Sequence, residues 1–110
     1  MLEDYVALAD AAYEKLIDAG DPTLLNETGD VISMTLSSGT LQIRKIEGSI
    51  IFVVRNQKGE ITDQFDDDFL IDNGVNGHFG KYSGLFTRLN RKRSGADQIL
   101  RSIIDELEGD

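Results

Sequence analysis

The stretch from residue 66 to residue 80 holds the densest set of side chains that could do chemistry. Three consecutive aspartates at 66–68 are followed by Asp72 and a run rich in asparagine and glycine. Clustered carboxylate and amide oxygens are what Ca²⁺ prefers. In an EF-hand alignment that starts at Asp72, however, the third and twelfth ligand positions fall on Gly74 and Ser83. We therefore interpret the stretch as a solvated acidic loop and predict no metal site, while a calcium-binding or small-ligand module using loop 66–80 stays as an alternative.

The same loop contains glycines that could approach a phosphate. Gly74, Gly77 and Gly80 precede Lys81 at a predicted helix start. A glycine-rich turn before a helix can hold phosphate through backbone N–H groups. The spacing fits neither the P-loop nor the dinucleotide fingerprint. Turn glycines explain the pattern better, and we predict no cofactor.

His78 is the only histidine in the chain, and so the only side chain whose ordinary pKa lies near neutrality. A nucleophilic triad could draw on Ser83 or Ser94 together with Asp72. Neither serine lies in a nucleophile-elbow motif, and nothing in the sequence places two carboxylates in one pocket, as glycoside hydrolysis would need. We predict a surface histidine in a turn, no catalytic residues and no enzyme.

Charge is unevenly distributed along the chain. The 20 acidic and 11 basic residues give a net charge of −9, which opposes binding to nucleic acid. Six of the acids lie between 60 and 72, whereas the segment between Asp72 and Asp97 holds five bases and no acid. Three of these bases, Arg88, Arg91 and Lys92, share one helical side by their spacing. The two segments either neutralise each other within the fold or form a bipolar contact surface for a protein.

The elements that position these residues follow from hydrophobic periodicity. Apolar residues from Leu2 to Ala19 repeat every three or four positions, which predicts an amphipathic helix that ends at Gly20 and Pro22. From about Val31 to Gln64 the period becomes two, with turn residues between the runs, which predicts four antiparallel strands.

Turn positions predict the register of the strands. A tight turn at Ser38-Gly39 would place Met34 opposite Ile43, and one at Glu47-Gly48 would place Ile43 opposite Phe52 and Arg44 opposite Ile51. One sheet face is then wholly apolar. The other face is mixed and holds Thr35, Gln42, Arg44, Ile51, Val53, Arg55 and Thr62.

After a predicted loop at 63–80, helical spacing resumes at Tyr82 and is interrupted at Ser94-Gly95. Ser94 and Asp97 form a capping-box pattern for a final amphipathic helix, whose stripe includes Ile99 and Ile103. We predict one α+β domain over 1–110, with an N-terminal helix, a four-strand meander and two C-terminal helices packed on one sheet face in two layers.

The composition also indicates the cellular compartment in which the protein works. The chain has no cysteine, which excludes disulfides and thiolate metal sites and fits a reducing compartment. Its first residues are acidic where a signal peptide would be basic, and no apolar run is long enough to span a bilayer. We expect a cytoplasmic protein with no membrane partner.

The second half resembles short uncharacterised bacterial α+β proteins. The resemblance rests on the strand and turn at 50–59, the basic helix around Leu85 to Lys92, and the final amphipathic helix after Asp97. It implies no known activity or site. Size and acidity are also similar to secretion chaperones and immunity proteins.

The leading functional hypothesis is a non-enzymatic protein-binding module that acts as a small regulator, adaptor or inhibitor. The residues expected to contact the partner are Arg44, Ile51, Val53, Arg55, Arg88, Arg91 and Lys92. Apolar residues with a polar rim are typical of an interface, and self-association through this sheet face or the last strand is one form of it. An alternative from another class is an acidic decoy that mimics DNA and occupies a nucleic-acid-binding enzyme.

Overall fold

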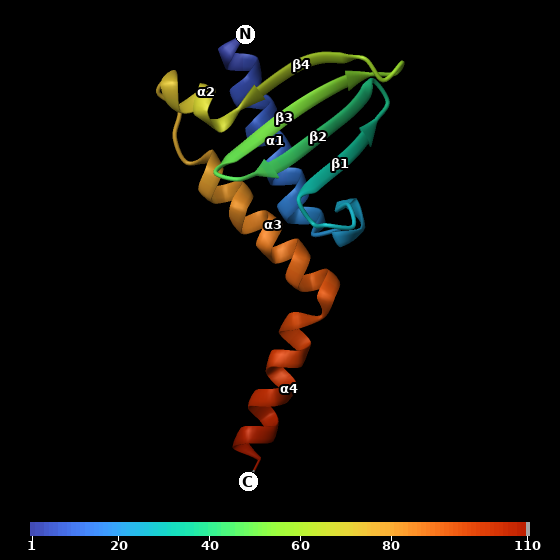
Figure 1. Ribbon diagram of the computed structural model, residues 1–110, viewed down its shortest axis with the longest axis vertical. Helices are drawn as coiled ribbons and strands as arrows, with labels where there is room; N and C mark the ends of the chain where they lie inside the picture. The colour runs from blue at the N-terminus through green and yellow to red at the C-terminus, as the bar shows by residue number, and fades with distance from the viewer. Residues whose placement is uncertain (110) are drawn as a thin grey trace.

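The computed structural model describes residues 1–109, and Figure 1 traces their path. A long helix comes first, followed by a meander of four antiparallel strands in the order β1-β2-β3-β4, and then three helices. The bounds are α1 Leu2–Ala19, a 3₁₀ turn Pro22–Leu24, β1 Val31–Leu36, β2 Gly39–Ile46, β3 Ser49–Asn56, β4 Ile61–Asp66, α2 Asp67–Asp72, α3 His78–Ser94 and α4 Ala96–Glu108. The predicted α+β class and the order of its elements are confirmed.

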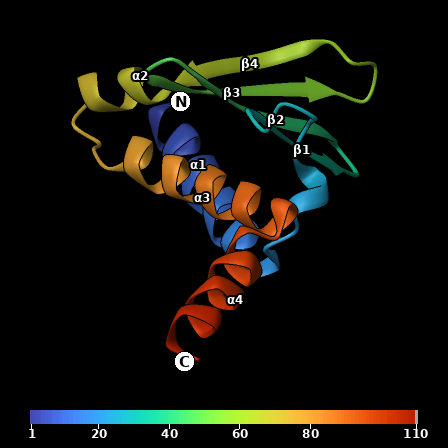
Figure 2. The ribbon, with the colours of Figure 1, turned by 60° about the horizontal axis from the view of Figure 1, so that its bottom comes forward.

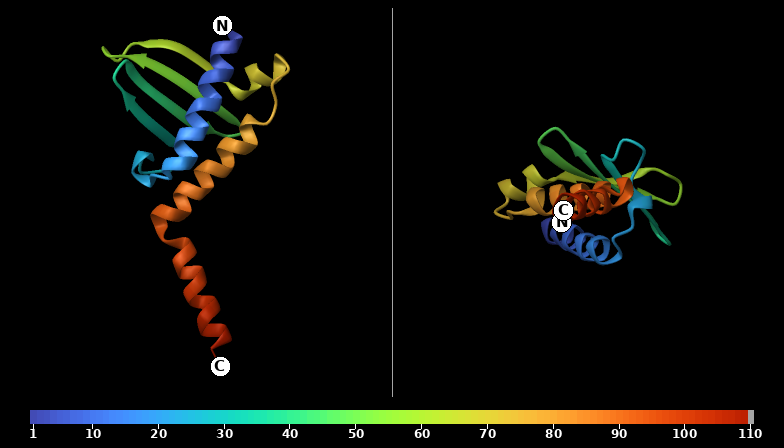
Figure 3. Two further views of the ribbon diagram at one scale, coloured as in Figure 1. Left: turned by 180° about the vertical axis from the view of Figure 1, so that it is seen from behind. Right: turned by 90° about the horizontal axis from the view of Figure 1, so that it is seen from below.

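Two helices cover one face of the sheet. Seen from behind, α1 and α3 lie in front of the strands (Figure 3), and the view in Figure 1 shows the opposite face with no helix over it. The core between the layers includes an aromatic row, in which Tyr5 stacks on Phe65, Phe65 stacks on Phe52, and Phe52 meets Tyr82 edge-on. The other fully buried large side chains are Leu16, Ile32, Ile43, Ile50, Leu70, Leu85, Phe86 and Leu89. The predicted apolar face is therefore the one that the helices cover.

The second hairpin has the predicted register and the first does not. Ile43 pairs with Phe52 and Arg44 with Ile51, as expected from a turn at Glu47-Gly48. In the first hairpin Met34 pairs with Leu41, because the two turn residues are Ser37 and Ser38. Gly39 belongs to β2, where an added Cβ would overlap the Arg55 carbonyl of β3. The glycine thus permits close approach of two strands and does not form the turn.

The segment predicted as a loop is mostly regular structure. The fourth strand runs to Asp66, and α2 follows at once. The Asp66 carboxylate accepts a hydrogen bond from the Phe69 N–H and caps the helix. The buried Asp67 carboxylate accepts a 2.7 Å hydrogen bond from the Ile50 N–H at the start of β3. These aspartates fix α2 against the sheet, so local hydrogen bonding explains why the acids stand there.

The last helix departs from the prediction, since it does not pack on the sheet. Only Gly95, in the left-handed conformation with φ 72°, separates α3 from α4, and α4 then runs away from the body of the protein (Figure 2). The Cα radius of gyration is 16.4 Å, against about 13 Å for a compact domain of this length.

The break between α3 and α4 lies at Ser94-Gly95, as predicted, but the N-terminus of α4 is capped differently from the prediction. The predicted capping box does not form: Gly95 is the N-cap of α4, and the Ser94 hydroxyl donates to the Arg91 carbonyl. Asp97 instead forms a 2.8 Å ion pair with Arg91 across the break. Among residues 1–109, no helix is long and apolar enough to cross a membrane.

Candidate functional site

Four of the predicted contact residues share the open face of the sheet. Arg44, Ile51, Val53 and Arg55 all line one shallow hollow on this face. Val53, however, is only 4% exposed. Gln42 of β2 pairs with Val53 of β3. The Arg44 and Arg55 guanidinium groups, one from each side of this pair, both donate to the Gln42 side-chain oxygen, at 3.4 and 3.3 Å. Val53 is thus already covered and cannot supply the free apolar contact expected of it.

A β-bulge changes the composition of this face. The register shifts between Val54 and Arg55, so that Arg55 pairs with Ile61 and Thr62 becomes the extra residue. Thr62 was expected on the open face, but it lines a hollow on the helical side instead. Ile61 takes its place and is 51% exposed. The open face is therefore more apolar than the sequence indicated.

The basic residues of α3 form a different surface, because α3 lies in the helical layer. Arg91 is held by Asp97, and Lys92 donates a 2.6 Å hydrogen bond to the Gly20 carbonyl at the end of α1. A cation at a helix C-terminus stabilises the helix dipole. Arg88 is exposed. Two of the three basic residues thus have structural partners, and the set does not join the open sheet face in one surface.

An apolar stripe on α4 lies exposed, and we define it as Ala96, Ile99, Leu100, Ile103, Ile104 and Leu107. Ile99 is 57% exposed, Leu100 51%, Ile103 48%, Ile104 39% and Leu107 79%. No α4 residue is buried. Scattered exposed aliphatic residues are ordinary on a protein surface, but a contiguous row marks an interaction site. The periodicity of this stripe was predicted from the sequence, but the predicted packing of the final helix on one sheet face was wrong, because no α4 residue is buried.

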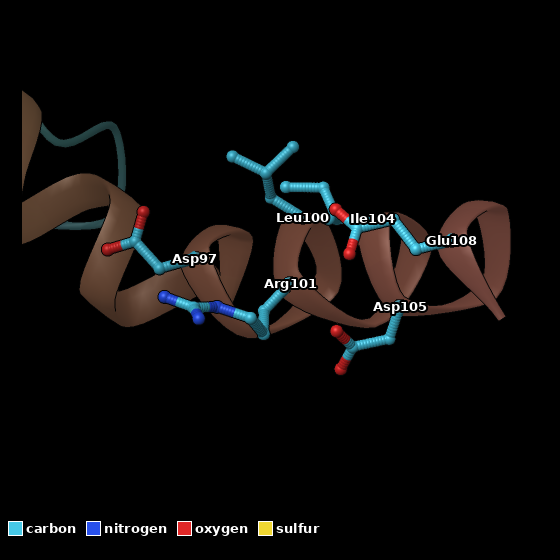
Figure 4. Close-up of a pocket in the computed structure, with 6 residues that line it drawn as sticks. All are labelled: Asp97, Leu100, Arg101, Ile104, Asp105 and Glu108. Carbon is cyan, nitrogen blue, oxygen red and sulfur yellow. The ribbon is translucent and has the colours of Figure 1, made fainter.

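The flank of α4 is open on its outer side. In Figure 4, Leu100 and Ile104 project from one side of the helix and Arg101 and Asp105 from the other. All six residues that line the hollow here come from this one helix. A ligand there would touch a single wall, whereas small-molecule sites enclose most of the ligand surface. The arrangement suits the contact of a helix with a protein surface.

A second apolar hollow lies on the helical side, at the turn end of the sheet. It measures about 530 Å³ and is lined by Leu8 of α1, Leu36 and Val54, among others. Leu36 is half exposed because α1 does not reach the end of the first hairpin. The hollow is also lined by the hydroxyl residues Ser37, Ser38, Thr40 and Thr62 and by Arg55, and no lining residue could act as a general base toward these hydroxyls.

His78 is buried, contrary to the expected surface turn. It is 5% exposed at the start of α3, and its Nε2 lies 2.8 Å from the Asp10 carboxylate of α1. Its Nδ1 and the Ser83 hydroxyl are both buried without a hydrogen-bond partner among the described residues, so they do not bond to each other. The geometry therefore joins two helices and does not form the triad that the sequence allowed.

Burial also raises the pKa of Tyr82, which lies one helical turn after His78 on α3. The Tyr82 side chain lies in the core and donates to the Ala9 carbonyl of α1. Burial, together with the nearby Asp10 carboxylate, raises the pKa of Tyr82 well above its ordinary value. The hydroxyl is thus held neutral as part of the contact between α1 and α3.

The acidic loop gives no metal centre in the part of the chain that the structure describes. No three of its histidine, aspartate or glutamate side chains come together in a way that could hold an ion. Asp66 caps α2, Asp67 binds the start of β3, and Asp68 accepts from the Ser49 hydroxyl. The three carboxylates point to three separate backbone or side-chain donors.

Comparison of the chain with models of protein families, with curated proteins and with solved structures gave no match.

Proposed function

We propose that this protein is a non-enzymatic, cytoplasmic protein-binding module and that α4 is the element that docks on the partner. The observation that carries the proposal is the α4 stripe, in which five large aliphatic side chains on one helix face are 39–79% exposed. Amphipathic helices commonly bind by laying such a face, with anchors at i, i+3, i+4 and i+7, into an apolar groove.

The free energy that burial of the α4 stripe would supply supports this role. Full burial of an aliphatic side chain stabilises by about 1.5–3 kcal/mol, so covering what is exposed of the five would yield roughly 4–8 kcal/mol. Association costs an estimated 4–15 kcal/mol in lost freedom of motion. The stripe is thus large enough to matter and small enough to need further contacts, which fits a reversible regulator, adaptor or inhibitor.

The contacts at the junction of α3 and α4 also favour binding. The Gly95 N–H closes the end of α3, the Ile99 N–H bonds to the Gly95 carbonyl, and the Arg91–Asp97 ion pair spans the break. A helix that is already formed and oriented loses less entropy on docking than a disordered segment would.

The test is photo-crosslinking in the cells that make the protein. A benzophenone amino acid placed at Ile103, in the centre of the stripe, is expected to form an adduct with one protein, identified by its mass. The same group at Ser102, the neighbouring residue on the polar side, serves as the control and is expected to form none. Equal adducts at both positions, or none at Ile103, would contradict the proposal.

A further inference from the structure

The open face of the sheet is a second surface without a cover. Five aliphatic residues share this face: Val31, Ile46, Ile51, Val53 and Ile61. Ile46 and Ile61 are about half exposed, and Ile51 is partly exposed. One face of an antiparallel sheet is commonly solvated when it is polar, but this face combines aliphatic residues with arginine. It thus has the composition of an interface with a polar rim.

The arginines of this face have no carboxylate partner. Among residues 1–109 the only ion pairs within 4 Å are His78–Asp10 and Arg91–Asp97. Arg44 bonds only to Gln42, and Arg55 to Gln42 and the Gly59 carbonyl. A hydrogen bond from Thr28 lowers the pKa of the Asp30 carboxyl, and Arg44 lies near enough to help lower it, while the Asp66 carboxylate beside Ile51 caps α2. Neither arginine forms an ion pair, so both cations stand beside exposed aliphatic side chains and can pair with an acidic partner.

Helix α4 has the complementary character. Its 13 residues carry four acids, Asp97, Asp105, Glu106 and Glu108, and one base, Arg101. The acids follow the edges and the back of the apolar stripe. Packing α4 against another α4 would bring like charges together, which disfavours that pairing. Packing it on the open sheet face would match apolar with apolar and acid with arginine.

The helix cannot reach the open face of its own sheet. Helix α3 lies on the opposite face, and only Gly95 connects it to α4. The views from the front and from behind agree that α4 leaves the body at the end of α3 and does not pass round the sheet (Figures 1 and 3). The matching surface is therefore available only on another molecule.

We infer that the partner is a second copy of this chain, with α4 of each copy covering the open sheet face of the other. This inference rests on the proposed function, because α4 is the docking element in both. A stable interface takes about 20–30 residues from each side, more than the stripe alone offers. A two-fold exchange forms the same contact twice and gives each copy both a helix and a sheet face.

Disulfide mapping tests the arrangement, since the chain has no native cysteine. Purified Ile103→Cys and Ile51→Cys variants, mixed and oxidised, are expected to give the mixed disulfide at about ten times the yield of a Ser102→Cys and Ile51→Cys mixture, because only close Cβ atoms can be bridged. Predominant pairing of Ile103→Cys with itself would overturn the inference in favour of helix-to-helix contact. Preferred pairing with Leu36→Cys would overturn it in favour of the hollow on the helical side.

Charge reversal provides an independent measurement. Arg44→Glu with Arg55→Glu removes four ion pairs from the two-fold dimer and is expected to weaken it roughly 4- to 900-fold in sedimentation equilibrium. Adding Asp105→Lys and Glu106→Lys to the same chain is expected to restore part of the loss. An unchanged dissociation constant would contradict the charge pairing. A protein that is monomeric throughout, yet forms the Ile103 adduct with another protein in cells, would overturn the inference and leave the proposed function standing.

Discussion

Leucine-to-alanine substitutions in α3 and α4 are expected to differ strongly in their effect on the free energy of unfolding. Leu85 of α3 is 2% exposed and lies in the core, whereas Leu100 of α4 is 51% exposed and touches no buried cluster. The chemical change is the same in both, and both sites are in the middle of a helix. Leu85→Ala leaves a cavity and is expected to lower the free energy of unfolding by about 2–5 kcal/mol. Leu100→Ala is expected to change it by no more than about 0.5 kcal/mol in dilute protein.

The assay is urea unfolding followed by far-ultraviolet circular dichroism, with the linear extrapolation to water. The comparison is repeated over a range of protein concentrations. If α4 is buried only by association, the effect of Leu100→Ala grows with concentration, while the effect of Leu85→Ala stays constant. A loss above about 1 kcal/mol for Leu100→Ala in dilute protein would refute the reasoning, because α4 would then pack within the monomer.

Three further predictions concern the body of the fold. Asp67→Ala is expected to lower the free energy of unfolding by about 1–3 kcal/mol in the same assay, because the Ile50 N–H loses its buried acceptor. Asp67→Asn keeps an acceptor oxygen and is expected to cost less. Equal losses of stability in the two variants would show that this acceptor is dispensable. Gly29→Ala is expected to lower the free energy of unfolding by about 1–3 kcal/mol, since φ is 75° and an added Cβ would overlap the Asn90 side chain of α3. An added Cβ at Gly48 meets open space, so Gly48→Ala is expected to be nearly neutral. A neutral Gly29→Ala would contradict the described loop. Because burial raises the pKa of Tyr82, the unfolded chain loses this proton first, and stability should fall as the pH rises above about 10. Tyr82→Phe is expected to reduce that alkaline loss in urea titrations at several pH values, and an identical pH profile would argue against a buried neutral phenol.

The register of the second hairpin and the location of the three longer helices could be predicted because each follows from local periodicity. The pairing of Ile43 with Phe52 followed from alternation on both strands, which a slip of one residue would have reversed. The first hairpin was placed wrongly because glycine suggested a turn. Its actual role, close approach of Gly39 to the Arg55 carbonyl, depends on a third strand that turn chemistry does not describe.

The position of α4 could not be predicted, because an apolar stripe has the same spacing whether a core or another protein covers it. The stripe of α3 at Leu85 and Leu89 is buried, and the similar stripe at Ile99 and Ile103 is exposed. The difference is one of tertiary packing, since the α3 residues lie in the core and no α4 residue is buried. For the same reason the burial of His78 against α1 was missed, since its partner is 68 residues away in the chain.

Thiol labelling in two settings tests most directly the claim that the α4 stripe is free in the isolated chain and covered in the working protein. The chain has no native cysteine, so the Ile103→Cys variant carries a single thiol. In dilute purified protein a maleimide is expected to label this thiol as fast as that of the Ser102→Cys control. In intact cells that make the protein, the first thiol is expected to be protected and the control to stay reactive. Equal labelling of both thiols in cells would contradict the account.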